Sequence, residues 1–336
     1  MNFDFSEDQY SLQAAARDFF AGESSPDHVR AMWDDETGRS PALWKKMAET
    51  GFVGLTVPEE HGGLGMDEVD LVLLLEEAGR AALPEPLVET TAIGVPLLRE
   101  AGSEAQQATW LPRIAAGDAI VAVKLDAQPF ATDAHVADLL LLEREGALHA
   151  VPKDRFTAVV QPSMDGSRRP CSVAAEVGDD TRMPGDAATA AAAAFDRGAW
   201  ATAAVLNGIG QKLLEMTTAY VKERHQFGRP VGSFQAVKHH LADALLVVET
   251  ARAAAWYTAL AIAEGRPDRS EAVSVAKSAA SDAAATANHA ALQCHGGIGF
   301  TWEHDLHLWL KRGKALEAAF GSASWHRARL AEIVFA

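Results

Sequence analysis

Apolar residues recur every three or four positions along the first part of the chain, which is the spacing of one face of an α-helix. The pattern is clearest in the series Leu71, Leu74, Leu75 and Ala78. A glycine-rich turn with the sequence PEEHGGLG, from Pro58 to Gly65, interrupts the helical pattern. We therefore predict an N-terminal helical domain over residues 1–116.

Short β-type runs, separated by Gly, Pro and Asp, replace this pattern between about Asp118 and Pro184. The four runs are Ala119–Val123, Ala137–Leu142, Leu148–Val151 and Phe156–Val160. Each run is long enough for one strand of a sheet. We predict a reduced β-sheet domain over residues 117–187.

Alanine-rich segments with helical spacing fill the rest of the chain. The predicted helices are Phe195–Arg224, Ser233–Glu264, Ser270–Cys294, Trp302–Arg312 and Lys314–Phe335. Helices of roughly 25 to 30 residues span about 40 Å, and alanine lets neighbouring helices approach closely. We predict a C-terminal antiparallel four-helix bundle over residues 188–336, so the fold class is mainly α with a small β domain.

Charge and composition narrow the possible ligands. The 336 residues carry a formal net charge of −16. Such a balance disfavours a broad surface for nucleic acid or anionic membrane, so a polyanionic ligand must be met by a few local cations. We expect no nucleic-acid partner, and individual arginines become informative.

The lack of a recognisable signal peptide and the small number of cysteines favour a cytoplasmic protein. The only cysteines are Cys171 and Cys294, which cannot form a disulfide framework and suit a reducing compartment. The start, MNFDFSEDQY, lacks the basic and apolar regions of a signal peptide, and no run of about 18 apolar residues predicts a membrane span. We therefore expect no membrane partner.

Two segments combine polar or cationic side chains with glycines at the ends of predicted helices. The first, ERHQFGRPVG, runs from Glu223 to Gly232, and the second, QCHGGIGF, runs from Gln293 to Phe300. The forked guanidinium of Arg224 suits a phosphate, and glycines let backbone N–H groups meet ligand oxygens. Together the segments predict half of a site for a phosphate-bearing cofactor.

Structural roles are the alternative for each residue. Arg224 could pair with a helix carboxylate, Phe227 could belong to the core, and Gly296 and Gly297 could cap the preceding helix. The adjacent histidines at 239 and 240, and those at 304 and 307, lack the spacing of a helical zinc site. We predict no metal.

The order of a helical domain, a small β domain and a helical bundle resembles the acyl-CoA dehydrogenase family. The segments around Arg224 and Gln293 and the Pro58–Gly65 turn resemble that family too. The resemblance implies an FAD-dependent enzyme that oxidises the Cα–Cβ bond of an acyl-CoA substrate. It also implies an electron-transferring flavoprotein, or a similar acceptor, as a partner.

In the family, the segments corresponding to those around Arg224 and Gln293 reach across a dimer interface to the pyrophosphate and adenosine of the neighbour's FAD. Carried over residue by residue, this implies the following cofactor-binding residues: Arg224, Phe227, Gln235, Gln293, Gly296 and Gly297. The resemblance therefore assigns one half of an FAD site to this chain.

The catalytic base of the family has no counterpart in this sequence. The family's Tyr-Glu-Gly-Thr segment matches the segment from Ala319 to Ser322, so Phe320 stands at the carboxylate position. The family's other base position falls near Gly198. Glu317 and Asp196 are the nearest acids, and we treat them as the only substitute candidates for a catalytic role.

The flavin-ring loop also departs from the family. A Thr-Glu-Pro-Gly-x-Gly-Ser-Asp type loop matches the segment from Leu125 to Asp133, which keeps Pro129 and Asp133 but loses the glycines. Phe130 would obstruct close approach of the backbone to a flavin. We expect no flavin ring in this chain's own β domain.

A retained half-site without a base or flavin loop resembles the shortened, base-lacking subunit of the heteromeric (α2β2) steroid side-chain acyl-CoA dehydrogenases of actinobacteria. The implied partner is a homologous subunit that carries the catalytic Glu, and the implied substrate is a steroid side-chain CoA ester. Two alternatives remain open. One is a homomeric dehydrogenase with Glu317 or Asp196 as an unusual base, and the other is a non-catalytic structural subunit.

Overall fold

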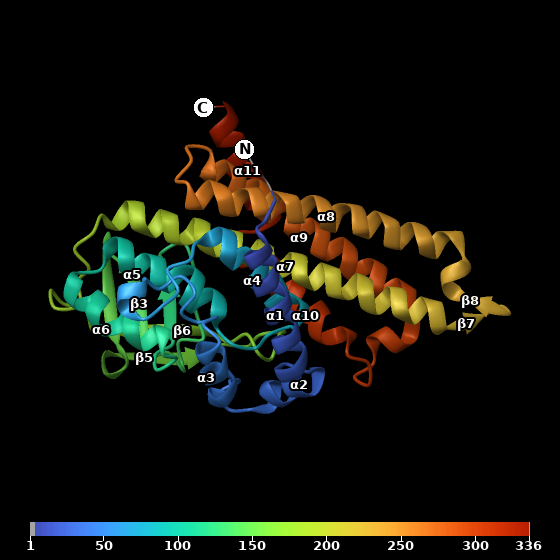
Figure 1. The fold of residues 1–336 in the computed structure, drawn as a ribbon, viewed down its shortest axis with the longest axis horizontal. Helices are drawn as coiled ribbons and strands as arrows, with labels where there is room; N and C mark the ends of the chain where they lie inside the picture. The colour runs from blue at the N-terminus through green and yellow to red at the C-terminus, as the bar shows by residue number, and fades with distance from the viewer. Residues whose placement is uncertain (1–3, 336) are drawn as a thin grey trace. The chain divides into compact units, whose positions relative to one another are not determined.

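The computed structural model describes residues 4–335 and is mainly helical with small sheets, which confirms the predicted fold class (Figure 1). The chain divides into two compact units. The first, the helical unit, comprises the residues up to 30, residues 72–83 and the residues from 202 onward. The second, the mixed unit, comprises residues 31–71 and 84–201.

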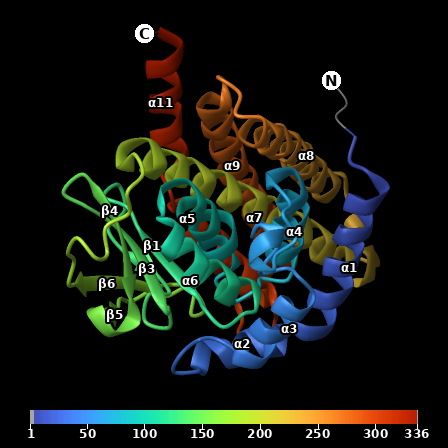
Figure 2. The same cartoon turned by 60° about the vertical axis from the view of Figure 1, so that its left-hand side comes forward.

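The helical unit is built from long helices. Its elements are α1 (Glu7–Glu23), the end of α4 (Glu68–Arg80), the second half of α7 (Ala187–Glu223), α8 (Gln235–Ala263), α9 (Arg269–His295), α10 (Leu306–Glu317) and α11 (Ala323–Phe335). α8 and α9 pack along one another, as both views show (Figures 1 and 2). The buried face of α9 is almost wholly Ala and Ser, so α9 can approach its neighbours closely.

Two glycines let α4 and α7 cross with their backbones in contact. A Cβ added at Gly208 would lie 1.9 Å from the carbonyl oxygen of Glu76, and one at Gly79 would lie 2.1 Å from that of Val205. No side chain fits either gap, so both positions require glycine. This crossing fixes α7, and therefore the segment that follows its C-terminal end.

The mixed unit combines short helices with two small sheets. Its helical elements are α3 (Pro41–Glu49), a π-helical segment (Val88–Gly94), α5 (Val95–Ala101) and α6 (Glu104–Ala115), and α2 (Pro26–Asp34) spans the boundary between the units. The strands are β1 (Val121–Lys124), β2 (Ala131–Thr132), β3 (Leu139–Arg144), β4 (Ala147–Pro152), β5 (Phe156–Val160) and β6 (Pro170–Ala175).

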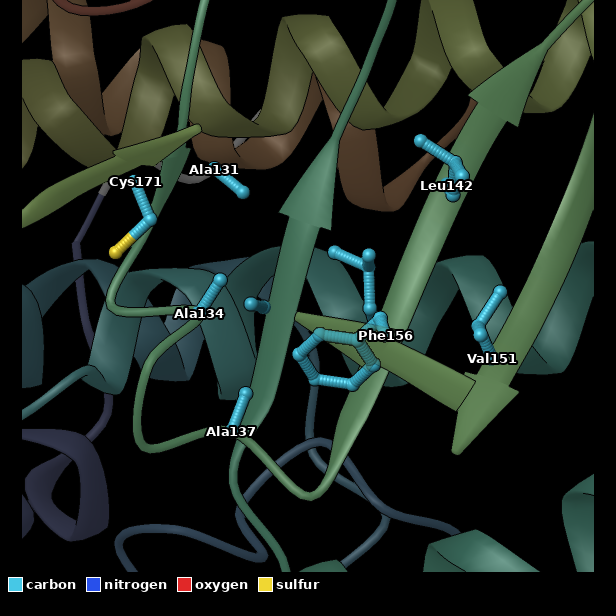
Figure 3. Close-up of a cluster of buried hydrophobic side chains, with 9 residues drawn as sticks. Ala131, Ala134, Ala137, Leu142, Val151, Phe156 and Cys171 are labelled. Atoms are coloured by element: carbon cyan, nitrogen blue, oxygen red, sulfur yellow. The ribbon is translucent and has the colours of Figure 1, made fainter. Parts of the chain in front are cut away.

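Strand order is β1-β3-β4 in one sheet and β2-β6-β5 in the other, with a parallel β1–β3 pair and antiparallel pairs elsewhere. The core of this domain is small because alanine supplies much of it. Figure 3 shows Phe156 among Ala131, Ala134, Ala137 and Cys171. The sheets are thus held by a small core in which alanines surround a few larger side chains, among them Leu140, Val151 and Phe156.

Most predicted elements lie where the sequence pattern put them. The exceptions include β2, which at two residues is too short to give an alternating pattern. β6 was missed because it begins at Pro170, a residue that disfavours strand interiors. A helix break was expected at Gly313, yet α10 continues through it to Glu317, since Gly313 is buried inside the bundle. The chain instead turns at Phe320 and Gly321, which have φ angles of 51° and 91°.

Helix α8 is unusually apolar for its exposure. It is long and apolar enough to cross a membrane, but the core helix of a bundle passes the same test. Only 33% of its most apolar window is buried, and Leu245 and Leu246 are 47% and 68% exposed. Extended apolar surface is typical of sites of interaction.

Candidate cofactor half-site

Arg224 caps the C-terminal end of α7. Its backbone N–H donates to the Tyr220 carbonyl at 2.9 Å, and its carbonyl accepts from Val231 N at 2.7 Å. The side chain is exposed, and within residues 4–335 no carboxylate forms an ion pair with it. The alternative of a pairing with a helix acid is therefore wrong. The guanidinium is available to a ligand.

A tight hairpin follows and presents Phe227 to solvent. Strands β7 (His225–Gln226) and β8 (Arg229–Pro230) pair, and the two residues between them have positive φ angles, 53° at Phe227 and 77° at Gly228. This is the backbone of a two-residue type I′ turn, which favours Gly but strains Phe. Phe227 is 92% exposed, so the core alternative is also wrong. A strained, exposed phenyl ring at a hairpin tip is suited to an external contact.

Helix α8 begins at Gln235 with an uncapped N-terminus. Phe234 at the N-cap makes no side-chain hydrogen bond to the first turn, and Gln235 is exposed. The guanidinium of Arg229 lies 4.0 Å from the ring centroid of Phe234. Free N–H groups at a helix start, with cations nearby, favour an anion such as a phosphate. The sequence pattern did not single out Arg229.

The second motif lies at the C-terminal end of α9. Gly296 caps the helix through its N–H to the Leu292 carbonyl, with φ 64° and ψ −140°, a backbone conformation reserved for glycine. The capping alternative therefore holds for Gly296. A Cβ added at Gly296 or Gly297 would meet nothing within 4 Å, so the backbone here is open to a ligand.

Gln293 and Gly296 line a groove of about 560 Å³ between α8 and α9. The other side chains lining it are His240, Asp243, Thr286, His289, Ala290, Leu292 and Phe300. Arg224, Phe227 and Gln235 lie outside this groove, on the α7–α8 connection. Sequence reasoning set aside His240 as part of a weak metal pattern and missed Asp243, although their i,i+3 spacing puts them on one helix face.

A direct contact ties the two motifs together. The ring of Tyr220, one helical turn before Arg224, stacks on His295 with centroids 4.4 Å apart, and the Tyr220 hydroxyl donates to the His295 carbonyl at 3.4 Å. His295 immediately precedes Gly296. Burial lowers the pKa of His295, so the imidazole stays neutral, and its Nδ1–H donates to the Ala291 carbonyl. The contact joins the C-terminal end of α7 to the C-terminal end of α9, where the two predicted segments begin.

The loop that matches the family's base segment is closed and filled by hydrocarbon. Phe320 is 4% exposed, and its carbonyl accepts from His326 Nε2 at 2.8 Å. The ammonium of Lys277, itself fully buried, donates to the carbonyls of Glu317 and Gly321 at 3.0 Å each. Ser281 Oγ also lies 3.1 Å from this ammonium. The loop is thus tied to α9 and α11 by buried polar groups.

The two substitute acids are placed differently. Glu317 has one carboxylate oxygen paired with Lys314 at 2.7 Å, while the other is buried without a hydrogen-bond partner among the described residues. Asp196 is buried within α7, as is Gly198 at the family's second base position. Neither acid lies in the groove that Gln293 and Gly296 line.

The loop that matches the family's flavin loop leads into a buried ion pair. Asp133 adopts φ 60° and pairs with Arg39, and both residues are buried. Burial raises the pKa of nearby Glu85 to about 7, and it raises the pKa of Glu89 as well. Phe130 is 38% exposed just before β2. Asp133 therefore serves the packing of the mixed unit.

No metal site is evident in the part of the chain that the structure describes, because no group of three or more His, Cys, Asp or Glu side chains converges there. The predicted cofactor-binding residues have the chemistry of a site for an organic anion. An unpaired arginine, an uncapped helix start and open glycine backbone suit the pyrophosphate and adenosine side of a dinucleotide.

Comparison with known proteins identifies the family of the chain. Residues 6–118 match the sequence model "Acyl-CoA dehydrogenase, N-terminal domain", and residues 187–335 match "Acyl-CoA dehydrogenase, C-terminal domain". Acyl-CoA dehydrogenase IpdE2 of Mycolicibacterium smegmatis is 34% identical, covering 98% of this chain and 100% of the relative. IpdE2 of Mycobacterium tuberculosis is 36% identical over 91% of each.

Solved structures share the whole fold. The steroid ACAD Tcur3481-Tcur3483 is 27% identical with a TM-score of 0.89, covering 98% of both chains. Butyryl-CoA dehydrogenase of Megasphaera elsdenii matches in fold with a TM-score of 0.89 at 21% identity over the full length of both chains. The chain therefore belongs to the acyl-CoA dehydrogenase family of FAD-dependent oxidoreductases.

Proposed function

We propose that this chain is one subunit of a heteromeric acyl-CoA dehydrogenase. It contributes the pyrophosphate and adenosine half of a shared FAD site. A homologous partner in an α2β2 heterotetramer supplies the catalytic Glu and the flavin loop. The proposed location is cytoplasmic, and the proposed acceptor is an electron-transferring flavoprotein or a similar protein.

The observation that carries the proposal is that the loop around Phe320, which matches the family's base segment, holds no carboxylate at the base position. α-Proton abstraction needs a carboxylate at the reacting carbon. Phe320 occupies that position, and its carbonyl is already bonded to His326. The carbonyls that flank it are bonded to Lys277, so the loop is pinned on both sides. This chain supplies no proton acceptor at the family's position.

The half-site supports the binding role. FAD, when bound, supplies the two-electron acceptor for α,β-dehydrogenation. Arg224 would hold the pyrophosphate by paired N–H donors, and the start of α8 at Gln235 would add backbone N–H groups. Gln293, Gly296 and Gly297 would meet the adenosine side, with Phe227 against the dinucleotide. All these side chains bind and orient, and none transfers a proton.

The exposed face of α8 supports a partner subunit. Leu245 and Leu246 stand out from a helix that begins at the half-site, so a chain covering them would also reach the cofactor. Because these leucines are 47% and 68% exposed, burying them contributes roughly 2 to 3 kcal/mol of hydrophobic free energy to association. The proposed substrate, a steroid side-chain CoA ester, rests on similarity to the steroid ACAD Tcur3481-Tcur3483.

Counting flavins tests the proposal. The chain is purified alone and together with a candidate homologous subunit, and FAD is measured by absorbance after denaturation. We expect little flavin in the chain alone and fewer flavins than chains in the complex. A yellow homomer with one flavin per chain, bleached by an acyl-CoA, would contradict the proposal.

A homomeric enzyme with an unusual base is the second candidate, and the unpartnered buried oxygen of Glu317 favours it. In that case Glu317→Gln or Asp196→Asn abolishes flavin bleaching by the chain alone. A purely structural subunit is the third candidate. For that role Arg224→Ala leaves the flavin content of the complex unchanged, whereas a shared site loses flavin.

A further inference from the structure

A small pocket at the meeting of α1, α2, α4, α7 and α10 carries a concentration of positive charge. Its volume is about 160 Å³, and its charged lining residues are Arg17, Arg80, Lys212 and Glu77. Phe20 and Trp309 form an apolar floor and are 1% and 2% exposed. All the residues that line it belong to the helical unit. The excess of cations is notable in a chain of net charge −16.

The acceptor groups around this pocket are already occupied. The Glu77 carboxylate accepts from Gln13 at 3.1 Å and from Arg17 at 3.0 and 2.6 Å, and it forms an ion pair with Arg80 at 3.0 Å. The Arg80 carbonyl accepts from Trp309 Nε1 at 2.9 Å, and the Ala81 carbonyl from Ser24 Oγ at 3.5 Å. Glu215, beside the pocket, pairs with Arg80. The acids therefore leave little free acceptor capacity.

Several donors remain. Each guanidinium has five N–H groups, and the bonds to Glu77 and Glu215 leave Arg17 Nη1 and Arg80 Nη2 unused among the described residues. The Lys212 ammonium lies 5.5 Å from the Trp309 ring centroid and pairs with no carboxylate in that part of the chain. Ser25, whose hydroxyl oxygen accepts from His28 N at 3.3 Å, also lines the pocket beside the N-terminal end of α2. A pocket whose hydrogen-bond acceptors are occupied, but which has unused N–H donors, suits a ligand rich in acceptor oxygens.

From this geometry we infer a binding site for a small oxyanion of the phosphate class. The arginines would each offer one N–H, and Lys212 would add a mobile ammonium from the rim, while the Glu77 pairings hold the arginines in place. The site lies outside the half-site of Arg224 and Gln293, and it does not depend on the proposed function.

The inference is tested by titrating the purified chain with inorganic phosphate at constant ionic strength and measuring the heat of binding by calorimetry. Potassium chloride at equal ionic strength serves as the control for screening. We expect saturable binding to the wild-type chain, with one site that remains when Arg224→Ala removes the half-site cation. We expect Lys212→Gln to weaken it about tenfold or more, as the loss of one charge-assisted hydrogen bond implies. Lys212→Arg should preserve binding.

Two further variants keep the outcome decisive. Lys45→Gln makes the same charge change at a half-exposed position in the mixed unit, and Arg224→Ala removes the half-site cation. Both should retain phosphate binding. The inference is overturned if no binding occurs, if Lys212→Gln binds as well as wild type, if both Lys→Gln variants lose affinity equally, or if only Arg224→Ala loses it.

Discussion

The Arg224–Gln293 surface and the Phe320 loop belong to the same helical unit but are built in opposite ways. At the first, the cation, the glycines and the phenyl ring of Phe227 are exposed, and few of their polar groups have partners. At the second, an apolar ring is buried, and the carbonyls around it are bonded to a buried ammonium and an imidazole. One region is organised to receive a ligand and the other to exclude one.

This contrast shows how a chain with the family fold can retain residues that bind the cofactor while it lacks the catalytic carboxylate. The half-site depends on helix ends, which stay open because no other segment of residues 4–335 covers them. The base position depends on one loop, and in this chain Lys277 and His326 make that loop part of the core. Each region therefore responds to substitution through a different observable, either stability or flavin content.

The largest expected effect is on stability, at Phe320. Phe320→Ala should lower the free energy of unfolding by about 3 to 5 kcal/mol, because it empties a buried site. The flavin content per folded complex should not change. Chemical denaturation of the chain and flavin absorbance of the complex measure the two quantities. Phe335→Ala, at a position 87% exposed, is the matched control and should be nearly neutral. If the folded Phe320→Ala variant lost flavin, the Phe320 loop would also contribute to cofactor binding, and the contrast between the two regions would not hold.

The next effect concerns pH and the buried interior. Burial raises the pKa of Glu76 to about 7, even though Trp256 and Arg252 bond to it. A raised folded-state pKa means that stability is greatest below the unfolded value near 4.5 and is lost as pH rises toward about 7. Glu76→Gln should remove roughly 3 kcal/mol of the difference in unfolding free energy between pH 5 and pH 8.

Denaturant titrations at the two pH values measure this difference for wild type and variant. Glu85 titrates in the same direction and is present in both proteins, so the subtraction isolates Glu76. Flavin content of the complex should be the same in both. An unchanged pH dependence in Glu76→Gln would show that this carboxyl ionises normally in the folded chain.

The next effect, on FAD binding, is expected at Arg224. It is smaller in free energy than the two before it, but it tests the proposed function more directly. Arg224→Ala should weaken FAD retention by the complex about tenfold or more, since one charged hydrogen-bond donor is lost. Stability of the chain should change by less than about 0.5 kcal/mol, because the side chain is exposed. Arg327→Ala, a half-exposed arginine of α11, is the control. Equal flavin in both variants would show that Arg224 does not bind the cofactor.

The smallest effect is expected at the hairpin tip. Phe227→Ala should weaken FAD retention about fivefold, as the loss of a contact worth about 1 kcal/mol implies. Phe227→Gly should give the same loss while relieving the strain of the positive φ angle. Gel filtration of the complex followed by flavin measurement compares them. Unchanged retention in both would assign the ring to protein contact alone.

Much of the fold could be predicted from sequence because the signals are local. The periodicity of the N-terminal part and the alanine-rich helices determine the fold class, and Phe156–Val160 was located to the residue. Helix ends could not be predicted as closely. α7 begins at Ala187 rather than Phe195, since a run of alanines carries no signal for a start.

The half-site could be predicted in part for the same reason. Arg224, Gln293 and the glycines belong to short segments whose residue types suggest a ligand. The closure of the Phe320 loop could not be predicted, because Lys277 and Gly321 are 44 positions apart. The Tyr220–His295 stack, separated by 75 positions, was inaccessible for that reason too. Contacts of that range depend on how helices pack, which the sequence pattern alone does not specify.

Flavin reduction by the chain alone tests the central claim most directly. The purified chain, supplied with FAD and an acyl-CoA without oxygen, is compared with the heteromeric complex by the loss of flavin absorbance. The account predicts bleaching by the complex and none by the isolated chain. Bleaching by the isolated chain, abolished by Glu317→Gln or Asp196→Asn, would contradict it.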